Sequence, residues 1–321
     1  MNVKKTILAS MIVSSMLVAV AGPIPAGAES VQEQKQTNSK KVQIDKTMAV
    51  KLQKAVNQFS GNEIKLQNVA ESLGGSEAKV TSVDGKYTVY FNDKEGVWSV
   101  DGAVPLDKIS KETQEKVLKA LKKAHVKKTY VLDKEAVLMR FYDGKKEKLK
   151  DHFAYKLTGK DFEAVWRSGT DFVSEVTIKL AKKELDSKWQ EMASKAMKTA
   201  FDHDLNVTEA LLVSSGENYH MLSIKDNAVS LEMDAIKGKI VNVFHHTRKK
   251  EMTDQRITAK DAQEVVAPLA KELFNIDITG YEVKWDNTNK DYGFVKGKET
   301  IMRAALDADK NAVYILSDGP A

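Results

Sequence analysis

The segment QEMASKAMKTAF at residues 190–201 recurs as QEVVAPLAKELF at residues 263–274, displaced by 73 positions. Apolar residues occupy matching places in both copies, at the spacing that puts them on one face of an amphipathic helix. The matched pairs are Met192 with Val265, Ala193 with Val266, Ala196 with Leu269, Met197 with Ala270, Ala200 with Leu273 and Phe201 with Phe274. Each copy therefore predicts a helix with one buried stripe.

The same displacement continues beyond the two helices. DAIKG at residues 234–238 matches DADKN at residues 307–311, and an alternating apolar strand precedes and follows each segment. Gly238 and Asn311 are the residue types that best tolerate the left-handed backbone of a tight hairpin. The repeated unit is thus one helix followed by an antiparallel β-meander. We expect an α+β protein built from tandem units of this kind.

Both copies carry signals for a helix start. Ser187 with Gln190, and Thr258 with Asp261, have the spacing of a capping box, in which a Ser or Thr precedes an acid or amide by three residues. Pro268 lies inside the second helix, where it removes a hydrogen bond and is expected to kink the helix.

The region 46–180 repeats less clearly. Helical spacing predicts helices at residues 48–59, 64–73 and 111–124. Runs rich in β-branched and aromatic residues predict strands at residues 86–91, 96–100, 129–142, 153–157, 162–167 and 172–180.

A faint further copy of the unit is suggested near the start of this region. The interval from Phe59 to Asn92 equals the interval from Phe201 to Asp234 in the clear repeat. Asn92 then opens a turn that ends at Gly96, as Asp234 opens the turn of the later copy.

Residues 1–28 have the three parts of a secretory signal peptide. Two lysines near the start precede an apolar run at residues 7–20, and the small residues Ala26 and Ala28 fit a signal peptidase that cleaves before Glu29. A permanent anchor needs about 20 apolar residues, more than this run has. We therefore expect a secreted protein with no integral membrane segment after cleavage; the alternative is an uncleaved N-terminal anchor.

The repeat resembles the PepSY domain, which has a helix, antiparallel strands and a hairpin of the form (M/L)-D-A-x-K-(G/N). The resemblance is best in LEMDAIKGKIV at residues 231–241 and ALDADKNAVY at residues 305–314, and it covers residues 185–317 well. The tandem arrangement behind a signal peptide is similar to secreted YcdB/YcdC-type repeat proteins of bacilli. The resemblance implies small α+β modules of the cell exterior, with proposed inhibitory or chaperone-like roles toward secreted peptidases. It supplies no catalytic signature.

The expected domain order follows from these features. The polar stretch 29–45 predicts a disordered spacer after the signal peptide. An N-terminal α+β region with degenerate PepSY-like modules is expected at 46–180, followed by PepSY-like modules at 181–249 and 250–321.

Composition excludes several classes of protein. The chain has no cysteine, so disulfides, thiol nucleophiles and a lipoprotein anchor are excluded. The net charge is +5, and the basic clusters at residues 122–128, 145–150 and 248–250 have acidic neighbours. These clusters lack the interleaved aromatic residues of a nucleic-acid groove, so we expect no nucleic-acid partner. Weak association with an anionic cell wall stays open.

The six histidines show no metal-binding spacing, neither a His-Glu-x-x-His motif nor an i, i+4 pair on a helix. They are His125, His152, His203, His220, His245 and His246. His245 and His246 are adjacent on a predicted strand end, so their side chains point to opposite faces. The run from Asp202 to Asp204 is interpreted as the end of a helix, because Ile276 replaces His203 in the other copy.

Other motifs of catalysis or ion binding are absent or incomplete. Asp307, Asp309, Asn311 and Asp318 imitate a calcium loop, but Ala312 stands where such a loop needs glycine. No nucleophile elbow, phosphate loop or dinucleotide fingerprint occurs. The four tryptophans are interpreted as anchors of the core or of a sheet face in preference to a platform that binds carbohydrate. They are Trp98, Trp166, Trp189 and Trp285. We expect no catalytic residue, metal ligand or cofactor, and the ligand-binding residues stay unassigned.

These observations favour a secreted non-enzymatic PepSY-like protein that binds or regulates extracellular proteins or peptidases. An exposed sheet edge that accepts a partner strand is one way to do so. The alternative is a cell-wall-associated structural protein that binds anionic wall polymer, and an unrecognised hydrolase is third.

Overall fold

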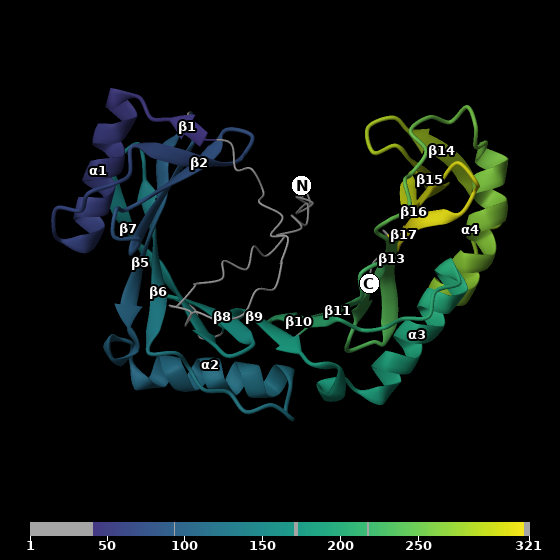
Figure 1. Ribbon diagram of the computed structural model, residues 1–321, viewed down its shortest axis with the longest axis horizontal. Helices are drawn as coiled ribbons and strands as arrows, with labels where there is room; N and C mark the ends of the chain where they lie inside the picture. Colours follow the sequence, from purple (N-terminus) through teal and green to yellow (C-terminus); the bar gives the residue numbers. More distant parts are fainter. Residues whose placement is uncertain (1–40, 93, 170–172, 217, 318–321) are drawn as a thin grey trace, which may run out of the picture. The chain divides into compact units, whose positions relative to one another are not determined.

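The computed structural model describes residues 41–92, 94–169, 173–216 and 218–317 of the 321-residue chain. Within them, one helix followed by four antiparallel strands occurs four times (Figure 1), and we number these units 1 to 4 in chain order. The predicted α+β class is confirmed. Unit 1 comprises α1 Lys46–Ser60, β2 Val69–Gly74, β3 Glu77–Thr81, β4 Tyr87–Asn92 and β5 Gly96–Pro105. Unit 2 comprises α2 Lys111–Ala124, β6 Glu135–Asp143, β7 Lys148–Gly159, β8 Phe162–Arg167 and β9 Val173–Leu180.

The second half of the chain supplies the other two units and follows the 73-residue displacement. Unit 3 comprises α3 Ser187–Phe201, β10 Glu209–Ser215, β11 Tyr219–Lys225, β12 Val229–Asp234 and β13 Lys239–His245. Unit 4 comprises α4 Ala259–Phe274, β14 Glu282–Asp286, β15 Asp291–Lys296, β16 Glu299–Leu306 and β17 Ala312–Ser317. A short strand, β1 Lys41–Gln43, precedes unit 1, and the 3-10 turns η1 Leu106–Lys108 and η2 Lys182–Glu184 precede α2 and α3.

The units join through backbone hydrogen bonds between antiparallel strands. Units 1 and 2 join through β5 and β6, and units 2 and 3 join through β9 and β10. At both junctions the last strand of one unit pairs with the first strand of the next. Units 3 and 4 join differently, because β13 pairs with β17, the last strand of unit 4. Strand β14 therefore ends the described sheet on one side, and β1, paired with β2, ends it on the other.

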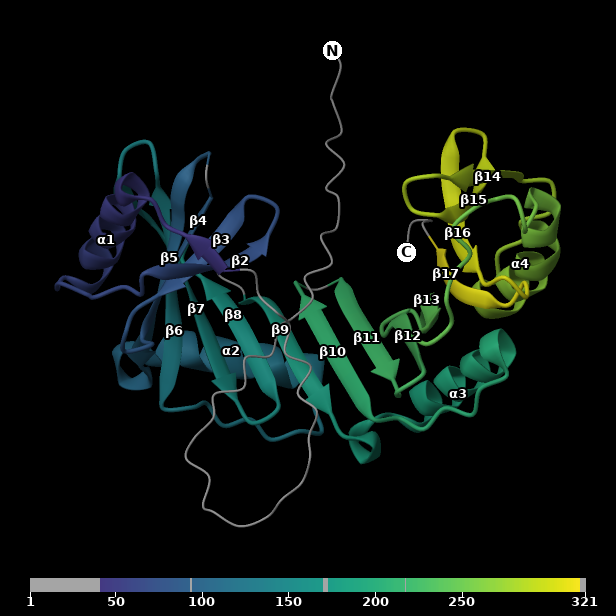
Figure 2. The ribbon, with the colours of Figure 1, turned by 45° about the horizontal axis from the view of Figure 1, so that its top comes forward.

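The helices pack on the sheet through the stripes that helical spacing creates. In α1 the buried residues are Leu52, Ala55 and Val56, which join Val89 and Phe91 of unit 1 and Tyr142 of β6 in one core. Helix α2 packs on β8 and β9 (Figure 2), and units 2 to 4 share a second, continuous core. The stripe predicted for α3 is buried as expected, at Ala193, Ala196, Met197, Ala200 and Phe201.

The helix starts are partly as predicted. The Thr258 hydroxyl accepts from the Asp261 amide at 3.1 Å, and the Asp261 carboxylate accepts from the Thr258 amide at 2.8 Å, so this capping box is confirmed. The start predicted at Ser187 is wrong by one residue. Asp186 caps α3 instead, because its carboxylate accepts from the Lys188 amide at 3.0 Å.

Pro268 does not end α4, which runs as one helix to Phe274. Its ring is exposed, whereas the buried stripe of α4 consists of Ala262, Val266 and Ala270. The backbone hydrogen bond that Pro268 cannot form is therefore missing on the side of the helix that faces water.

The hairpin between the third and fourth strands is fixed by the same side-chain contact in three units. The side chain of Asp234 accepts from the amides of residues 236 and 237, both at 2.9 Å. Asp307 accepts from the amides of residues 309 and 311, at 3.0 and 2.8 Å, and Asn92 from those of residues 94 and 95, at 3.1 and 2.5 Å. The matching intervals noted in the sequence are therefore matching turns.

Two expectations for the start of the chain are corrected. The predicted helix at 64–73 is wrong, because residues 69–74 form β2, which pairs with β1 on one side and β3 on the other. The local apolar spacing suits either structure, and the neighbouring strands decide it. The predicted disordered spacer is also too long, since residues 41–43 form β1 and Asp45 caps α1. Residues 29–40 lie outside the described part of the chain.

Gly102 in β5 allows α1 to approach the sheet. A Cβ atom at this position would lie 2.6 Å from the Phe59 ring and 2.9 Å from the Tyr87 ring. Gly102→Ala is therefore expected to lower the free energy of unfolding by about 1–3 kcal/mol, measured by urea denaturation. Gly293→Ala in β15 is the matched control, because its nearest neighbour would be the Thr300 methyl group at 3.5 Å. Equal destabilisation by both changes would contradict this account of the packing.

Candidate functional site

His203 and His246 lie near His245, and most of the six histidines make structural contacts. His245 packs edge-on against Phe201, with ring centroids 5.3 Å apart, and His246 stacks on Phe244 at 6.5 Å. The prediction that these two neighbours face opposite sides of the sheet is confirmed. His125 is buried with its Nε2 3.3 Å from a backbone carbonyl, and His152 is exposed.

His203 contacts the buried carboxylate of Asp226, which lies in the turn between β11 and β12. The His203 Nε2 atom lies 2.7 Å from one Asp226 oxygen, which also accepts from the Asn206 amide at 3.1 Å. The other oxygen accepts from the amides of Ala228 and Val229 at 2.8 and 3.0 Å. Burial opposes ionisation of Asp226, but these donors outweigh it and lower its pKa to about 2. The pair fixes the loop between α3 and β10 to the β11–β12 turn, as predicted for a helix-ending segment.

We expect Asp226→Asn to lower the free energy of unfolding by ~2 kcal/mol at neutral pH. Because the folded-state pKa is below the ordinary value of 3.8, the carboxylate stabilises the fold above about pH 4 and this contribution is lost as the pH falls toward 2. Urea denaturation between pH 7 and pH 3 measures the difference. Asp204→Asn is the control, since this side chain is 92% exposed. A difference between wild type and Asp226→Asn that does not shrink in acid would contradict the assignment.

The other candidate ligands serve the fold. Asp307 accepts backbone amides in its turn, and Asp318 lies outside the described residues. No three or more His, Asp or Glu side chains gather as metal ligands would in the ranges that the structure describes. Trp166, Trp189 and Trp285 pack against the shared core, and Trp98 lies beside Tyr90 with ring centroids 5.2 Å apart.

The residues of the predicted cleavage site, Ala26, Ala28 and Glu29, lie outside the described part of the chain. Of the helices that are described, none combines the length and the apolar character needed to cross a bilayer.

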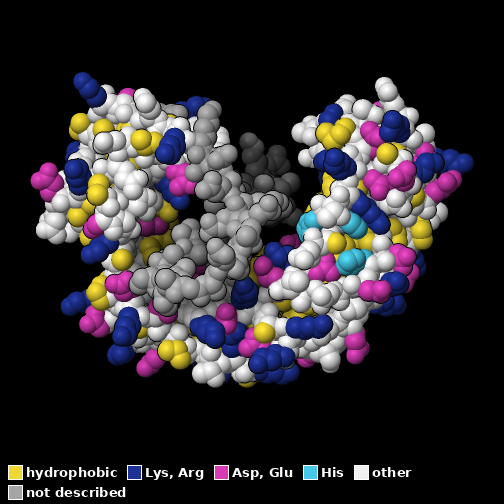
Figure 3. All heavy atoms as spheres, in the orientation of Figure 1, with side chains coloured by type: hydrophobic (Ala, Val, Ile, Leu, Met, Phe, Trp, Pro, Cys, Tyr) yellow, Lys and Arg dark blue, Asp and Glu magenta, His cyan; other side chains and the backbone are white. Residues whose placement is uncertain are grey.

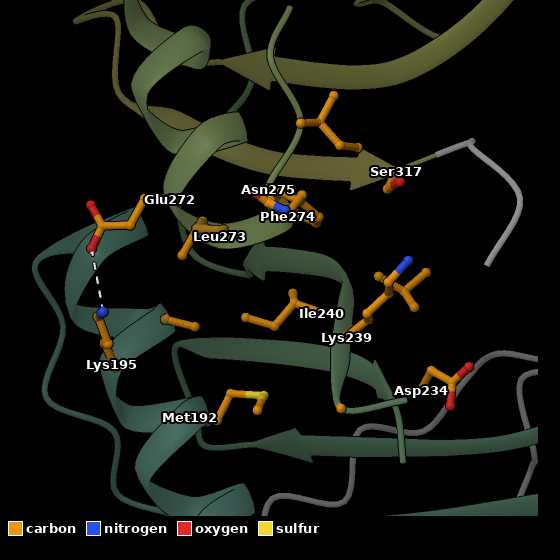
Figure 4. A pocket seen from close by; sticks show the side chains of 14 residues that line it. Met192, Lys195, Asp234, Lys239, Ile240, Glu272, Leu273, Phe274, Asn275 and Ser317 are labelled. Atoms are coloured by element: carbon orange, nitrogen blue, oxygen red, sulfur yellow. Dashed lines mark ion pairs between the residues drawn. The ribbon is translucent and has the colours of Figure 1, made fainter. Parts of the chain in front are cut away.

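A groove of about 570 Å³ opens between α3, β13 and the C-terminal end of α4 (Figure 4). Its apolar lining includes Met192, Ala196, Ile240, Leu273 and Phe274. Lys195 and Glu272 face each other across the two helices at 4.0 Å, and Lys239 and Asp234 also line the groove. The volume suits a small molecule. The charges balance, however, so they favour no class of ligand.

The edge of β14 is the most distinctive feature of the sheet. Its backbone pairs with β15 on one side, and no described strand pairs with the other side. In an antiparallel pair, alternate residues turn their N–H and C=O groups away from the partner strand. The first strands of the other units are covered at this position, β2 by β1, β6 by β5 and β10 by β9. The outer backbone groups of β14 thus have no partner strand among the described residues.

The side chains of β14 alternate between the two faces of the sheet. Val283 and Trp285 turn toward the core beneath α4, where Trp285 packs on Tyr292 with ring centroids 5.0 Å apart. Glu282 and Lys284 point the other way and pair at 2.8 Å, with 62% and 56% of their side chains exposed. The edge is therefore apolar on one face and charged on the other.

A polar network on the charged face holds β14 in place, with one residue from each strand of unit 4. Arg303 lies 2.9 Å from both Asp286 and Asp291, and Tyr314 donates to Asp291 at 2.8 Å. Hydrogen bonding to Arg303 holds the pKa of Asp286 well below its usual value, and burial followed by contact with Asp291 raises the pKa of Tyr314. The Asp291 side chain is only 2% exposed. Because Arg303 compensates both carboxylates, the network links all four strands of the unit.

Charge is interspersed on the face of the molecule shown in Figure 3, where Lys and Arg side chains alternate with Asp and Glu. Part of the basic cluster at residues 122–128 is used internally. The Lys128 side chain is 9% exposed and lies 3.1 Å from Glu184 and 3.5 Å from Asp161. Lys122 donates to the Lys128 carbonyl at 2.7 Å. These contacts reduce the positive charge available for an anionic polymer.

Comparison of the chain with protein-family models, curated proteins and solved structures finds no match.

The ligand-binding residues could not be assigned from the sequence, and the edge of β14 was not predicted. A signal for it was present in the 73-residue displacement. Lys284 and Asp286 replace the apolar Leu211 and Val213 of β10, and charged residues on a strand are typical of a position at the edge of a sheet.

Proposed function

We propose that this chain is a secreted, non-enzymatic protein that binds extracellular proteins, peptidases among them, through the free edge of β14. The observation that supports the proposal is the unpaired backbone of β14 in a sheet whose other first strands are all covered. Added strands gain main-chain hydrogen bonds at such an edge, and side-chain contacts supply selectivity.

The predicted signal peptide at residues 1–28 supports a place outside the cytoplasm. The resemblance of units 3 and 4 to PepSY modules supports a role toward secreted peptidases. The helix, the meander and the repeated Asp turn are the features on which that resemblance rests.

Binding of anionic wall polymer is the weaker proposal. It needs a face with a large excess of positive charge, whereas Lys128 is compensated by Glu184 and Asp161. An exposed basic face would also bind in a way that salt abolishes.

The proposal is tested by mixing the chain from residue 29 onward with the secreted peptidases of the organism that makes it. We expect a complex at micromolar concentration, detected by size-exclusion chromatography with light scattering. We also expect the bound peptidase to hydrolyse its substrate at a different rate from the free peptidase. The absence of any complex together with unchanged peptidase activity would refute the proposal. Retention on purified cell walls that is lost at high salt would favour the polymer-binding alternative.

A further inference from the structure

The molecule contains its own examples of a strand added to a first strand. β1, β5 and β9 each pair antiparallel with the first strand of a unit. The addition of β1 to β2 is the smallest example, since only three residues take part. In that register Lys41 stands opposite Glu71 and Val42 opposite Ala70, so residues of opposite charge lie on one face and apolar residues on the other.

The pairing of β9 with β10 gives the register expected at β14. The displacement of 73 places Val283 at the position of Ala210 and Trp285 at the position of Leu212. In the observed pair, Leu180 faces Ala210 and Ile178 faces Leu212, and these side chains are buried on the helix side of the sheet. A strand added to β14 in this register would place apolar residues opposite Val283 and Trp285.

On the other face of the sheet, charge selects which residues the added strand can carry. Lys284 stands where β10 has Leu211, and its exposed ammonium group pairs only with Glu282 of the same strand among the contacts of the described residues. An acidic residue opposite Lys284 would gain a cross-strand pair, whereas a basic residue would be repelled. Asp286 selects less strongly, because Arg303 already lies 2.9 Å from it.

We propose that β14 binds an extended segment of a partner protein as an antiparallel strand with the pattern apolar–acidic–apolar. These three residues lie opposite Trp285, Lys284 and Val283, in the register that β9 takes on β10. The inference rests on the proposed function, since it specifies the partner of the same edge. The charged residues of β14 also hinder unselective pairing of apolar strands, so the edge discriminates among partners.

Two synthetic peptides test the pattern with the chain from residue 29 onward. The first has the core Thr-Val-Glu-Ile between Ser-Thr flanks, and the second differs only by Lys in place of Glu. Binding is measured by fluorescence anisotropy of the labelled peptides. Wild type is expected to bind the Glu peptide about three- to tenfold more tightly than the Lys peptide, as expected for replacing an attractive cross-strand pair with a repulsive one.

Variants of single lysines make the test specific. Lys284→Glu is expected to reverse the preference in favour of the Lys peptide. Lys188→Glu makes the same change of charge at an exposed position of α3 and is expected to leave the preference as in wild type. Hydrogen exchange is expected to slow at amides of residues 282–286 when the Glu peptide is bound, because an added strand protects outward N–H groups.

Several results would overturn the inference while leaving the proposed function standing. Examples are a peptidase complex that forms although neither peptide binds at about 1 mM, a preference that Lys284→Glu does not reverse, and protection outside β14. Self-association that buries β14 would show that a second copy occupies the edge, and would also overturn the inference. Loss of the peptidase complex in all experiments would instead refute the proposed function.

Discussion

Backbone hydrogen bonding between the last strands of units 3 and 4 is the constraint that places β14 at one end of this sheet. A four-stranded meander has two edges, and each edge exposes N–H and C=O groups that neighbouring units can satisfy. Units 1 to 3 satisfy them in chain order, last strand to first strand. The pairing of β13 with β17 breaks that order, because the last strand of unit 4, and not its first, joins unit 3. The strands of unit 4 therefore follow in reverse order across the sheet, and its first strand, β14, lies at the end. One pairing thereby decides which backbone groups stay available to a partner.

The helices have a different task, which is to cover one face of the sheet. Small residues make this possible in α3, where Ala193, Ala196 and Ala200 are all buried. Gly102 does the same from the sheet side in unit 1, by leaving room for Phe59. The titratable groups largely serve the same architecture. Asp226 and His203 fix a turn to a loop, and Arg303 links the strands of unit 4 through two carboxylates. These ionic contacts hold a loop in one unit and the strands of another in place.

Much of the local structure could be predicted because it depends on neighbours in the sequence. Helix stripes and Asp turns are such features, and the repeat identified both in units 3 and 4. The segment at 64–73 shows the limit. Its spacing fits a helix, but β1 and β3 form hydrogen bonds with it on both sides and make residues 69–74 a strand. The N-cap of α3 is Asp186, one residue before the predicted Ser187. Either of these adjacent polar residues can accept hydrogen bonds from the first amides of the helix, so the sequence alone does not decide between them.

The candidate site could not be predicted in the same way, because an edge is defined by what does not pair with it. The residues of β14 do not indicate that β13 pairs with β17, a strand about seventy residues further along the chain. The substitutions at Lys284 and Asp286 do fit that choice once it is known. Leu211 and Val213 in β10 lie beside another strand, whereas the same positions in β14 lie at the end of the sheet. Charge at these positions keeps an exposed edge from pairing with any apolar strand. Protection of the edge and selection of a partner are therefore the same physical property, because the charge that repels most strands is the charge that a complementary strand neutralises.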